Sequence, residues 1–353
     1  MKPSTSVSVV MPVFNEASFI ESALKSLQAQ NSDGFELEIL VIDGMSEDGT
    51  QDKVRTLASR DPRIKLLSNP SRHTPAALNI GLRAAAGEYV CIMGAHAAYD
   101  PDYVSVCLEE LRAHQAVGCS GKVVTAPANK SMQARLVAWA SGHPFASSTR
   151  SVRTQPEGYA DTVAFPVMRK QPLLDTGGYN EKLVRNQDND MNQRLRAQGC
   201  KLYVTGKTQC RYHARPDVGS FLRYAFLNGL WNAFSLRENR ESMGLRHLAP
   251  LAFVAVLVIL LALQVGAVLA GIGTVLPLLA LAGILAVHLS VGTLAGLQTS
   301  WRQRTPAALS LAPLILGFHC AYGLGTMRGL LFPFAIQPSA TVRAIPESSD
   351  DPA

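Results

Sequence analysis

The sequence lacks most of the short patterns that identify common classes of protein. It contains neither GxGxxG nor GxxxxGK[ST], so a dinucleotide fingerprint and a P-loop are not supported. No basic low-complexity arm indicates a nucleic-acid partner. The six cysteines include no CxxC pair, so we expect reduced thiols and neither a zinc site nor a disulfide framework. The opening residues, MKPSTSVSVVMPVFNE, contain too short an apolar run for a signal peptide.

Charged side chains are absent from a long stretch of the C-terminal third. Residues 248–301 contain no Asp, Glu, Lys or Arg, which is enough for two membrane helices of about 20 residues each. Gly271 and Gly273 mark the expected hinge between them. A third apolar run, 305–327, either crosses the membrane or lies in its interface. Two spans and three spans are therefore both open, as is the side on which the chain ends.

Positive charges flank this apolar stretch but are missing from its hinge. Arg237, Arg240 and Arg246 precede it, and Arg302 and Arg304 follow it. The positive-inside rule therefore predicts that the N-terminal domain and the 301–304 loop are cytoplasmic. We expect a multi-pass protein of the inner (plasma) membrane. The net charge of +6 and the pI near 9.0 also suit an anionic partner, such as nucleotide phosphates, a lipid phosphate or an anionic membrane surface.

Strand-like and helix-like segments alternate through the N-terminal part of the chain. Short β-branched or aliphatic runs end in polar turns, and segments with apolar residues near 3.6 spacing separate them. The expected strands are 7–11, 37–42, 64–67 and 89–93, and the expected helices are about 19–27, 51–59 and 75–86. This alternation predicts an α/β domain with a mostly parallel sheet flanked by helices, of the kind that binds a nucleotide.

Polar residues follow three of these expected strands. Asn15 and Glu16 come after the first, Asp43 after the second and His96 after the fourth. Because ligands collect at the carboxyl ends of parallel strands, we expect these side chains to converge on one edge of the sheet. A helix is predicted to begin at Pro101, directly after the turn that holds His96.

Several polar residues also have a purely local explanation. Asp43 either contacts a base or ribose or forms the turn that Gly44 favours. Asp48 fits the cap of the next helix better than a ligand contact. Arg72 either pairs with a phosphate or is a solvated loop residue. Taken singly, these residues leave both explanations open.

The second half of the chain shows a looser pattern. Residues 159–165 resemble a strand, and RNQDNDMNQRLR from Arg185 opens a helix. Asp188 and Asp190 stand in its first turn, where the helix dipole favours negative charge. The aromatic stretch 221–234 is interpreted as an interfacial amphipathic helix, with Tyr224 and Trp231 in an aromatic belt. Core packing is the alternative for these aromatic residues.

Several short motifs, taken in order, resemble a known family. They are PVFNE, VIDGMSEDGT, NxG at Asn79–Gly81, AAGEYV, GGYNE, a DxD-like strand end and YGLG from Tyr322. The set resembles the inverting family 2 glycosyltransferases of the GT-A fold. More narrowly, it is similar to the membrane-anchored enzymes of succinoglycan-type exopolysaccharide synthesis, which read Asp-Ala-His in place of Asp-x-Asp. The resemblance covers residues from about 7 to 330.

The resemblance implies a role for each matching residue. A nucleoside diphosphate sugar would bind through Pro12, Asn15, Glu16, Asp43, Arg72 and Asn79. His96 would hold a divalent cation, Mn²⁺ or Mg²⁺, on the diphosphate. Asp188 would be the general base for an acceptor hydroxyl whose attack inverts the anomeric carbon. Asp161 and Arg194 would contact the acceptor, a polyprenyl-diphosphate-linked saccharide, although a solvated helix face explains Arg194 equally well.

Two departures from the family pattern bear on this site. Gly94 stands where the metal element usually begins with a carboxylate, and His96 stands at its third position. Imidazole is a normal ligand for manganese but a poor one for magnesium. Asp100 or Asp102 could supply the missing carboxylate, although capping the helix at Pro101 is the alternative for Asp100. In addition, Gln187 replaces the glutamate that usually precedes the base.

Four segments and two functions are expected. Residues 1–215 form a GT-A catalytic domain, 216–247 an interfacial amphipathic region, 248–330 a membrane domain of two to three helices, and 331–353 a disordered tail. The leading prediction is a glycosyltransferase acting on a lipid-linked acceptor at the cytoplasmic face of the membrane. The alternative is a catalytically impaired member that serves as a nucleotide-binding scaffold in a polysaccharide assembly complex. A processive synthase ranks below both, because its QxxRW element has no counterpart.

Overall fold

The computed structural model of the chain describes residues 5–332. Within that range the chain forms two compact units. The first comprises residues 5–121 and 163–208, and the second comprises 122–162 and 209–332. The tail that the sequence predicts to be disordered lies, from residue 333 onward, outside the described residues.

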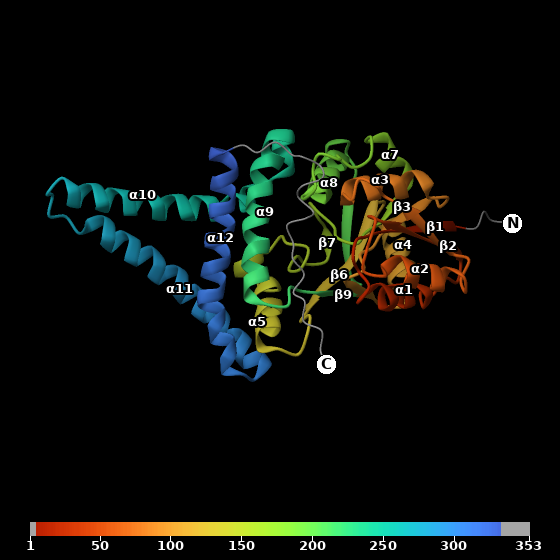
Figure 1. Cartoon of the computed structure of the whole chain (residues 1–353), viewed down its shortest axis with the longest axis horizontal. Coiled ribbons are helices and arrows are strands. Elements are labelled where there is room, and N and C mark those ends of the chain that lie inside the picture. The colour runs from red at the N-terminus through yellow and green to blue at the C-terminus, as the bar shows by residue number, and fades with distance from the viewer. Residues whose placement is uncertain (1–4, 333–353) are drawn as a thin grey trace. The chain divides into compact units, whose positions relative to one another are not determined.

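In the first unit, strands and helices alternate as the sequence predicts. The elements in order are β1 (Thr5–Val13), α1 (Ile20–Gln28), β2 (Phe35–Asp43), α2 (Thr50–Ala58), β3 (Ile64–Ser68), α3 (Thr74–Ala84) and β4 (Tyr89–Ile92). β1 and β2 bury most of their residues, as expected for strands covered on both faces. Helix α3 lies on one side of these strands, and α1 and α2 lie on the other (Figure 1).

The sheet is mixed. Its order is β3-β2-β1-β4-β8-β6-β9-β5, where β5 is Ala97–Tyr99, β6 is Gly118–Ala126, β8 is Val167–Arg169 and β9 is Leu202–His213. The pairs β1–β2, β1–β4 and β2–β3 are parallel, whereas β8 runs antiparallel to both β4 and β6. The short strand β7 (Gly158–Tyr159) pairs with β9. The carboxyl ends of β1, β2 and β4 therefore lie along one edge, which is where a ligand site is expected.

Two local predictions need correction. The helix expected at Pro101 begins as α4 (Tyr103–Ala113), and the residue at its N-cap is Asp102, which makes no side-chain cap hydrogen bond. The strand expected over 159–165 is wrong for most of its length: β7 is Gly158–Tyr159, residues 160–166 are not strand, and Phe165 has a left-handed φ of 54°. Helices α7 (Lys170–Asp175) and α8 (Gln187–Ala197) complete the first unit.

The second unit is largely helical. Its helices are α5 (Met132–Ser141), α6 (Pro144–Ser147), α9 (Val218–Glu238), α10 (Ala249–Leu269), α11 (Leu276–Gln303) and α12 (Leu311–Leu331). The short 3₁₀ turns η1 (Arg240–Ser242), η2 (Leu245–His247) and η3 (Pro306–Ser310) connect some of them. By length and composition, three segments could cross a membrane: Ala249–Leu269, Leu276–Gln303 and Pro306–Leu331.

Helices α9 and α12 pack side by side through glycines (Figure 1). A Cβ atom at Gly229 would meet the carbonyl oxygen of Tyr322, and one at Gly325 would meet the carbonyl oxygen of Phe226. The two backbones therefore touch, as they do at small-residue helix contacts. Trp231, on α9, is 1% exposed. It packs in the core, so of the two interpretations left open by the sequence the aromatic belt does not hold for Trp231.

Candidate active site

Two loops of the first unit meet at the carboxyl edge of the parallel strands. After β1, the N–H of Asn15 donates to Ser46 Oγ at 2.8 Å, and Asn15 Oδ1 accepts from the N–H of Glu47 at 3.0 Å. The N–H of Glu16 donates to Thr50 Oγ1 at 2.8 Å. The left-handed φ of 53° at Asn15, which asparagine tolerates, allows this turn. The Asn15 side chain thus fixes the loop that presents Glu16.

Asp48 shapes the start of the next helix. Its Oδ1 accepts from the N–H of Thr50 at 3.0 Å, at the first residue of α2, and its Oδ2 accepts from the N–H of Ala17 at 2.9 Å. The N-cap of α2 is Gly49, so Asp48 stands one residue before the cap, yet its side chain still accepts from the first N–H group of the helix. The same side chain also holds the loop after β1 against the loop after β2.

Asp43, the last residue of β2, is 2% exposed. Its Oδ2 accepts from the N–H of Ser46 at 3.0 Å and from Gln51 Nε2 at 2.7 Å. Its Oδ1 is buried and has no hydrogen-bond partner among the described residues. Leaving such an atom unpaired costs about 1–3 kcal/mol. The carboxylate therefore forms the local turn and also keeps one oxygen available for a donor group on a ligand.

His96 lies on the loop between β4 and β5 and meets a residue from the end of β1. Its Nε2 is 2.8 Å from Glu16 Oε1, and its ring packs edge to face on Phe19 with the centroids 4.6 Å apart. Glu16 Oε2 is buried and has no hydrogen-bond partner within residues 5–332. The structure thus brings together two side chains that the sequence places 80 positions apart.

Arg72 stands at the same edge, in the loop between β3 and α3. Its Nη2 is 3.1 Å from Glu47 Oε1, and its guanidinium lies 5.9 Å from the centre of the Phe14 ring. Both charged side chains are exposed, so this ion pair contributes at most about 1 kcal/mol. An incoming phosphate could exchange with Glu47 at little cost. The phosphate-binding role of Arg72 stays a prediction.

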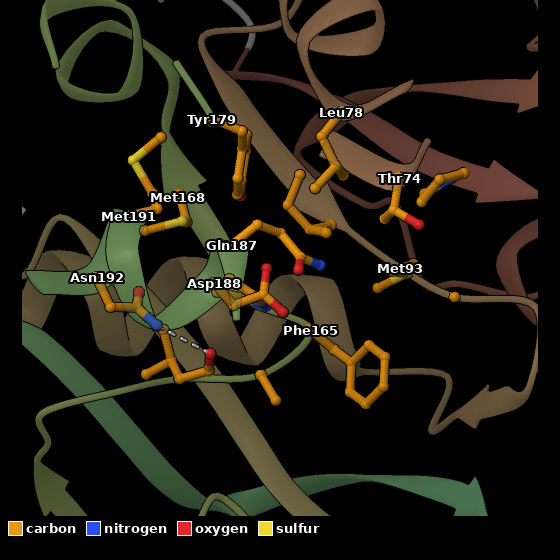
Figure 2. Close-up of a pocket in the computed structure, with 16 residues that line it drawn as sticks. Thr74, Leu78, Met93, Phe165, Met168, Tyr179, Gln187, Asp188, Met191 and Asn192 are labelled. Atoms are coloured by element: carbon orange, nitrogen blue, oxygen red, sulfur yellow. Dashed lines mark hydrogen bonds between the residues drawn. The ribbon is translucent and has the colours of Figure 1, made fainter. Parts of the chain in front are cut away.

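A pocket of about 180 Å³ lies in the first unit (Figure 2). Pro12 and Met93 line it from the ends of β1 and β4, together with Phe165 from the loop before β8. Gln187 and Asp188 project into it from the first turn of α8 (Figure 2). Its walls are mostly apolar, so the Asp188 carboxylate is its main charged group.

The environment of Asp188 changes its acidity. The carboxylate is accessible from the pocket, yet the many protein atoms around it limit its hydration and raise its pKa to about 6. Burial, and then the charge of Asp188, raise the pKa of the neighbouring Tyr179. A carboxylate whose pKa lies near neutral pH can take a proton from a hydroxyl group efficiently. The helix start therefore holds a group suited to base catalysis.

Asn79, predicted to bind nucleotide, is engaged elsewhere. Its Nδ2 donates to the carbonyl of Tyr179 and to Glu181 Oε1, both at 2.9 Å, and its Oδ1 accepts from the N–H of Tyr179 at 2.7 Å. The side chain is buried. These bonds give Asn79 a structural role, and its nucleotide contact stays a prediction. Asn79 fixes the turn that leads into α8, because its amide already bonds to that turn.

Arg194, predicted to contact the acceptor, is held in the same region. Its guanidinium donates to Asp190 Oδ2 at 2.9 Å, to the carbonyl of Thr176 at 2.7 Å and to the carbonyl of Gly178 at 2.8 Å. Arg194 thus ties α8 to the turn before it, so these contacts favour a positioning role. Asp161 belongs to the second unit, where its Oδ2 is 3.8 Å from Arg150 Nη1. Its acceptor contact stays a prediction.

The residues at the strand ends partly fit a divalent cation. No group of three His, Cys, Asp or Glu side chains that could hold a metal occurs within residues 5–332. Glu16 and His96 nevertheless bring a carboxylate and an imidazole together, and Glu16 Oε2 needs a partner. This donor set suits manganese better than magnesium. A Cβ at Gly94 would meet only Phe165, at 3.5 Å, so the site has room for a carboxylate there. Asp102, one of the two residues considered as a source of the missing carboxylate, accepts instead from Thr208 Oγ1 at 2.7 Å.

Some features of the site have no signal in the sequence. Gln51, which donates to Asp43, lies in a helical segment with no distinguishing motif, and Tyr179 lies in a glycine-rich turn. Neither residue could be singled out from the sequence. Phe165 lines the pocket from a left-handed backbone position that the sequence does not signal. Convergence of the strand ends predicts that Glu16, Asp43 and His96 lie close together. It does not predict which of them form a direct contact, and the structure shows that Glu16 and His96 do.

Comparison with known proteins supports the resemblance. The model of glycosyl transferase family 2 matches residues 8–174. Succinoglycan biosynthesis protein ExoA of Rhizobium meliloti (strain 1021) is 30% identical over 253 residues, which are 70% of this chain and 76% of that protein. Methanococcus voltae has a dolichyl N-acetyl-alpha-D-glucosaminyl phosphate 3-beta-D-2,3-diacetamido-2,3-dideoxy-beta-D-glucuronosyltransferase that is 22% identical over 333 residues, 92% of this chain and 97% of that protein.

A solved structure shares the fold. The mannosyltransferase PcManGT from Pyrobaculum calidifontis, in complex with GDP-Man and Mn²⁺, superposes with a TM-score of 0.57 at 19% sequence identity. The match covers 92% of this chain and 86% of that chain. The predicted GT-A fold, followed by apolar C-terminal helices, is confirmed.

Proposed function

This chain belongs to glycosyltransferase family 2, and on that premise we propose that it is an inverting hexosyltransferase that uses a nucleoside diphosphate sugar. The observation that carries the proposal is the Asp188 carboxylate, which faces the pocket with a pKa raised to about 6. Direct displacement at an anomeric carbon requires one base for the attacking hydroxyl. Asp188 is the group in the pocket that can meet this requirement.

The proposed reaction is a single displacement. An acceptor hydroxyl gives its proton to a carboxylate oxygen of Asp188 and forms a bond to the anomeric carbon from the face opposite the diphosphate. The bond between the anomeric carbon and the diphosphate oxygen breaks, and the nucleoside diphosphate leaves with the electron pair. The anomeric configuration inverts. Asn79 and Arg194 act indirectly, since they fix the turn and helix that aim Asp188.

The donor nucleotide is proposed to bind at the strand ends. The unpaired Oδ1 of Asp43 would accept from the base or a ribose hydroxyl, and Arg72 would exchange Glu47 for a phosphate. Glu16 and His96 would hold a divalent cation, and the donor diphosphate would complete its coordination. When bound, the cation offsets the negative charge that develops on the leaving diphosphate. The Mn²⁺ in the structurally similar mannosyltransferase supports this assignment.

The acceptor is proposed to be lipid-linked, as part of exopolysaccharide or related glycan synthesis. The relatives' names support this, since one acts in succinoglycan biosynthesis and another is named for a dolichyl phosphate-linked sugar. The candidate membrane helices of the second unit support it further, because a soluble acceptor would not require them. A polyprenyl-diphosphate-linked saccharide, reached from the cytoplasmic face of the inner membrane, fits these features.

Titration of the detergent-solubilised protein with UDP and GDP, each with and without Mn²⁺, tests the donor site. We expect one nucleotide to bind in a manganese-dependent manner. The His96→Ala variant should lose that dependence, whereas Asp188→Asn should bind normally. Gly94→Asp should tighten manganese-dependent binding, because the added carboxylate has space and lies two residues from His96. Gly94→Asn is the matched control, similar in size but without the charge.

A second function, a nucleotide-binding scaffold without turnover, is motivated by Gly94 and Gln187. Both replace carboxylates that the family usually carries at these positions. Incubation of the wild-type protein with nucleotide sugars and membrane lipid extract separates the two functions. Release of nucleoside diphosphate that depends on Asp188 supports the enzyme. Nucleotide binding without any release, for every donor tested, would support the scaffold.

A further inference from the structure

The second unit contains a constraint on membrane topology. Helices α9 and α12 run parallel to each other and touch along most of their length. Leu222 contacts Gly317, Phe226 contacts Gly325, and Arg237 Nη2 donates to the carbonyl of Gly329 at 2.9 Å. Residue numbers rise together along the two helices. Both helices must therefore begin on the same side of a membrane and end on the same side.

The loops between the helices are short and charged. Only residues 239–248 separate α9 from α10, and they contain two 3₁₀ turns with Arg240, Glu241 and Arg246. Only residues 304–310, mostly the turn η3, separate α11 from α12. Such connections do not cross the hydrocarbon layer. Each therefore keeps the helix end before it and the helix start after it on one side.

These contacts and loops are compatible with one topology. If α11 ends on the cytoplasmic side, α12 and α9 both begin there. If α10 and α11 each cross the membrane, α10 also begins on the cytoplasmic side. The short loop before α10 then keeps the end of α9 on the cytoplasmic side, which is the side on which α9 begins. Helix α9 then does not cross, and α12, which lies along it, does not cross either. A third span would require α9, which is not among the candidate spans of the described residues, to cross as well.

The dimensions of the unit agree with this topology. Figure 1 shows α10 and α11 diverging from a common tip and meeting α12 at two separate places. Pro250 on α10 contacts Gly323, and Gly292 and Gly296 on α11 contact the start of α12. At 1.5 Å per residue, these contacts lie about 24–30 Å from the tip, close to the roughly 30 Å thickness of the bilayer core.

The distribution of burial points the same way. Along their most apolar windows, 11% of α10 and 17% of α11 are buried, against 39% of α12. The large exposed hydrophobic side chains of α10 and α11 are mostly Leu, Ile and Val. Lipid chains would cover these surfaces, whereas α12 already has a protein partner in α9. Arg237 and Arg246 precede the hairpin and Arg302 follows it, while the tip has no charge, as expected for a tip on the far side.

We propose that the α10–α11 hairpin is the membrane-inserted surface of this protein, and that α12 lies with α9 at the cytoplasmic face without crossing. Residues 5–332 then contain two spans, the hairpin tip at residues 270–275 lies on the side of the membrane away from the cytoplasm, and α12 ends on the cytoplasmic side. This topology rests on the membrane location assumed in the proposed function, but it does not depend on catalysis.

Cysteine labelling in intact bacterial cells tests the hairpin. Gly273→Cys, at the tip, and Gly244→Cys, before α10, flank one helix, and neither added side chain would meet any atom within 4 Å. With the full chain and a membrane-impermeant maleimide, Gly273→Cys should label in intact cells. Gly244→Cys and the wild-type protein, which carries the six native cysteines, should label only after permeabilisation. Failure of Gly273→Cys to label until the cells are opened would overturn the proposal.

Reporter fusions after Ala353 test α12. A green fluorescent protein fusion should fluoresce, and an alkaline phosphatase fusion should be inactive, with both full-length products in the membrane fraction. The reverse pattern would show that α12 crosses and would overturn the two-span topology. Because neither readout needs sugar transfer, a protein that is inactive as a transferase but labels as expected would contradict the proposed function alone.

Discussion

The two units bury their chains in opposite ways. In the first, large aliphatic side chains fill the space around the sheet, and Val9, Ile39 and Val90 are fully buried. In the second, glycines let helix backbones touch, as at Gly229 and Gly325, and much of the aliphatic surface of α10 and α11 remains exposed. The stability of the first unit depends on its own core, whereas the second unit leaves apolar surface that lipid chains could cover.

The first unit also contains, at its proposed ligand site, buried polar atoms without hydrogen-bond partners within residues 5–332. The first unit places carboxylates at its strand ends and leaves Asp43 Oδ1 and Glu16 Oε2 buried without partners among the described residues. Such atoms reduce stability and are tolerated where a ligand completes them. We therefore expect substitutions at these strand ends and in the pocket to change chemistry more than stability. Substitutions at the glycine contacts of the second unit should do the reverse.

The largest effect is expected for Asp188→Asn. Removing a general base should lower kcat by about 10²- to 10⁴-fold. Thermal stability at pH 7.5 should be unchanged or higher, because the environment of Asp188 disfavours its charged form. Steady-state transfer assays and thermal unfolding in detergent measure the two quantities. If activity and stability fell together, Asp188 would be a structural residue, and the contrast between the units would fail.

Next is Gly325→Ala on α12. The added Cβ would meet the carbonyl of Phe226, so α9 and α12 must separate, at a cost of about 1–3 kcal/mol. The matched control is Gly266→Ala on α10, where a Cβ meets nothing within 4 Å. That change should be neutral or stabilising by up to about 1 kcal/mol, because alanine favours helix. Thermal unfolding in detergent gives both values; equal effects would show that the backbone contact is unimportant.

A smaller change in stability, with a distinct change in activity, is expected for Asn79→Ala. The variant leaves the N–H of Tyr179 without its partner, which costs about 1–2 kcal/mol. It also loosens the turn before α8, so kcat should fall while nucleotide affinity is retained. Asn129→Ala, at an exposed loop position, is the control. A loss of nucleotide affinity with unchanged kcat would instead support the direct contact that the sequence predicts.

The smallest effect is the pH dependence of the wild-type reaction. Asp188 must be ionised to accept a proton, and its pKa is raised to about 6. The value of kcat/KM should therefore be level above pH 7 and fall about tenfold for each pH unit below 6. A profile measured from pH 5 to 8 with saturating Mn²⁺ checks this. A decline that begins only near pH 4 would place the base in a more hydrated environment.

Much of the first unit could be predicted from sequence because its signals are local. The runs that become β1, β2, β3 and β4 are short and aliphatic, and each ends in a polar turn. Convergence of Glu16, Asp43 and His96 follows from parallel pairing alone. The insertion of antiparallel β8 beside β4 could not be predicted, since pairing between distant segments leaves no local pattern. Nor could the role of Asn79, whose partners lie 100 residues away.

By itself, the sequence determined the family, the order of strands and helices, the polar residues at the strand ends and the presence of long apolar helices. Those properties depend on short motifs, local periodicity and composition. Only the tertiary structure decided how the polar groups are used: Asp188 faces the pocket, while Arg194 and Asn79 bond to the turn before α8. It also decided that α12 has a helix for a neighbour. Hydropathy measures how apolar a helix is, but only packing shows whether protein already covers it.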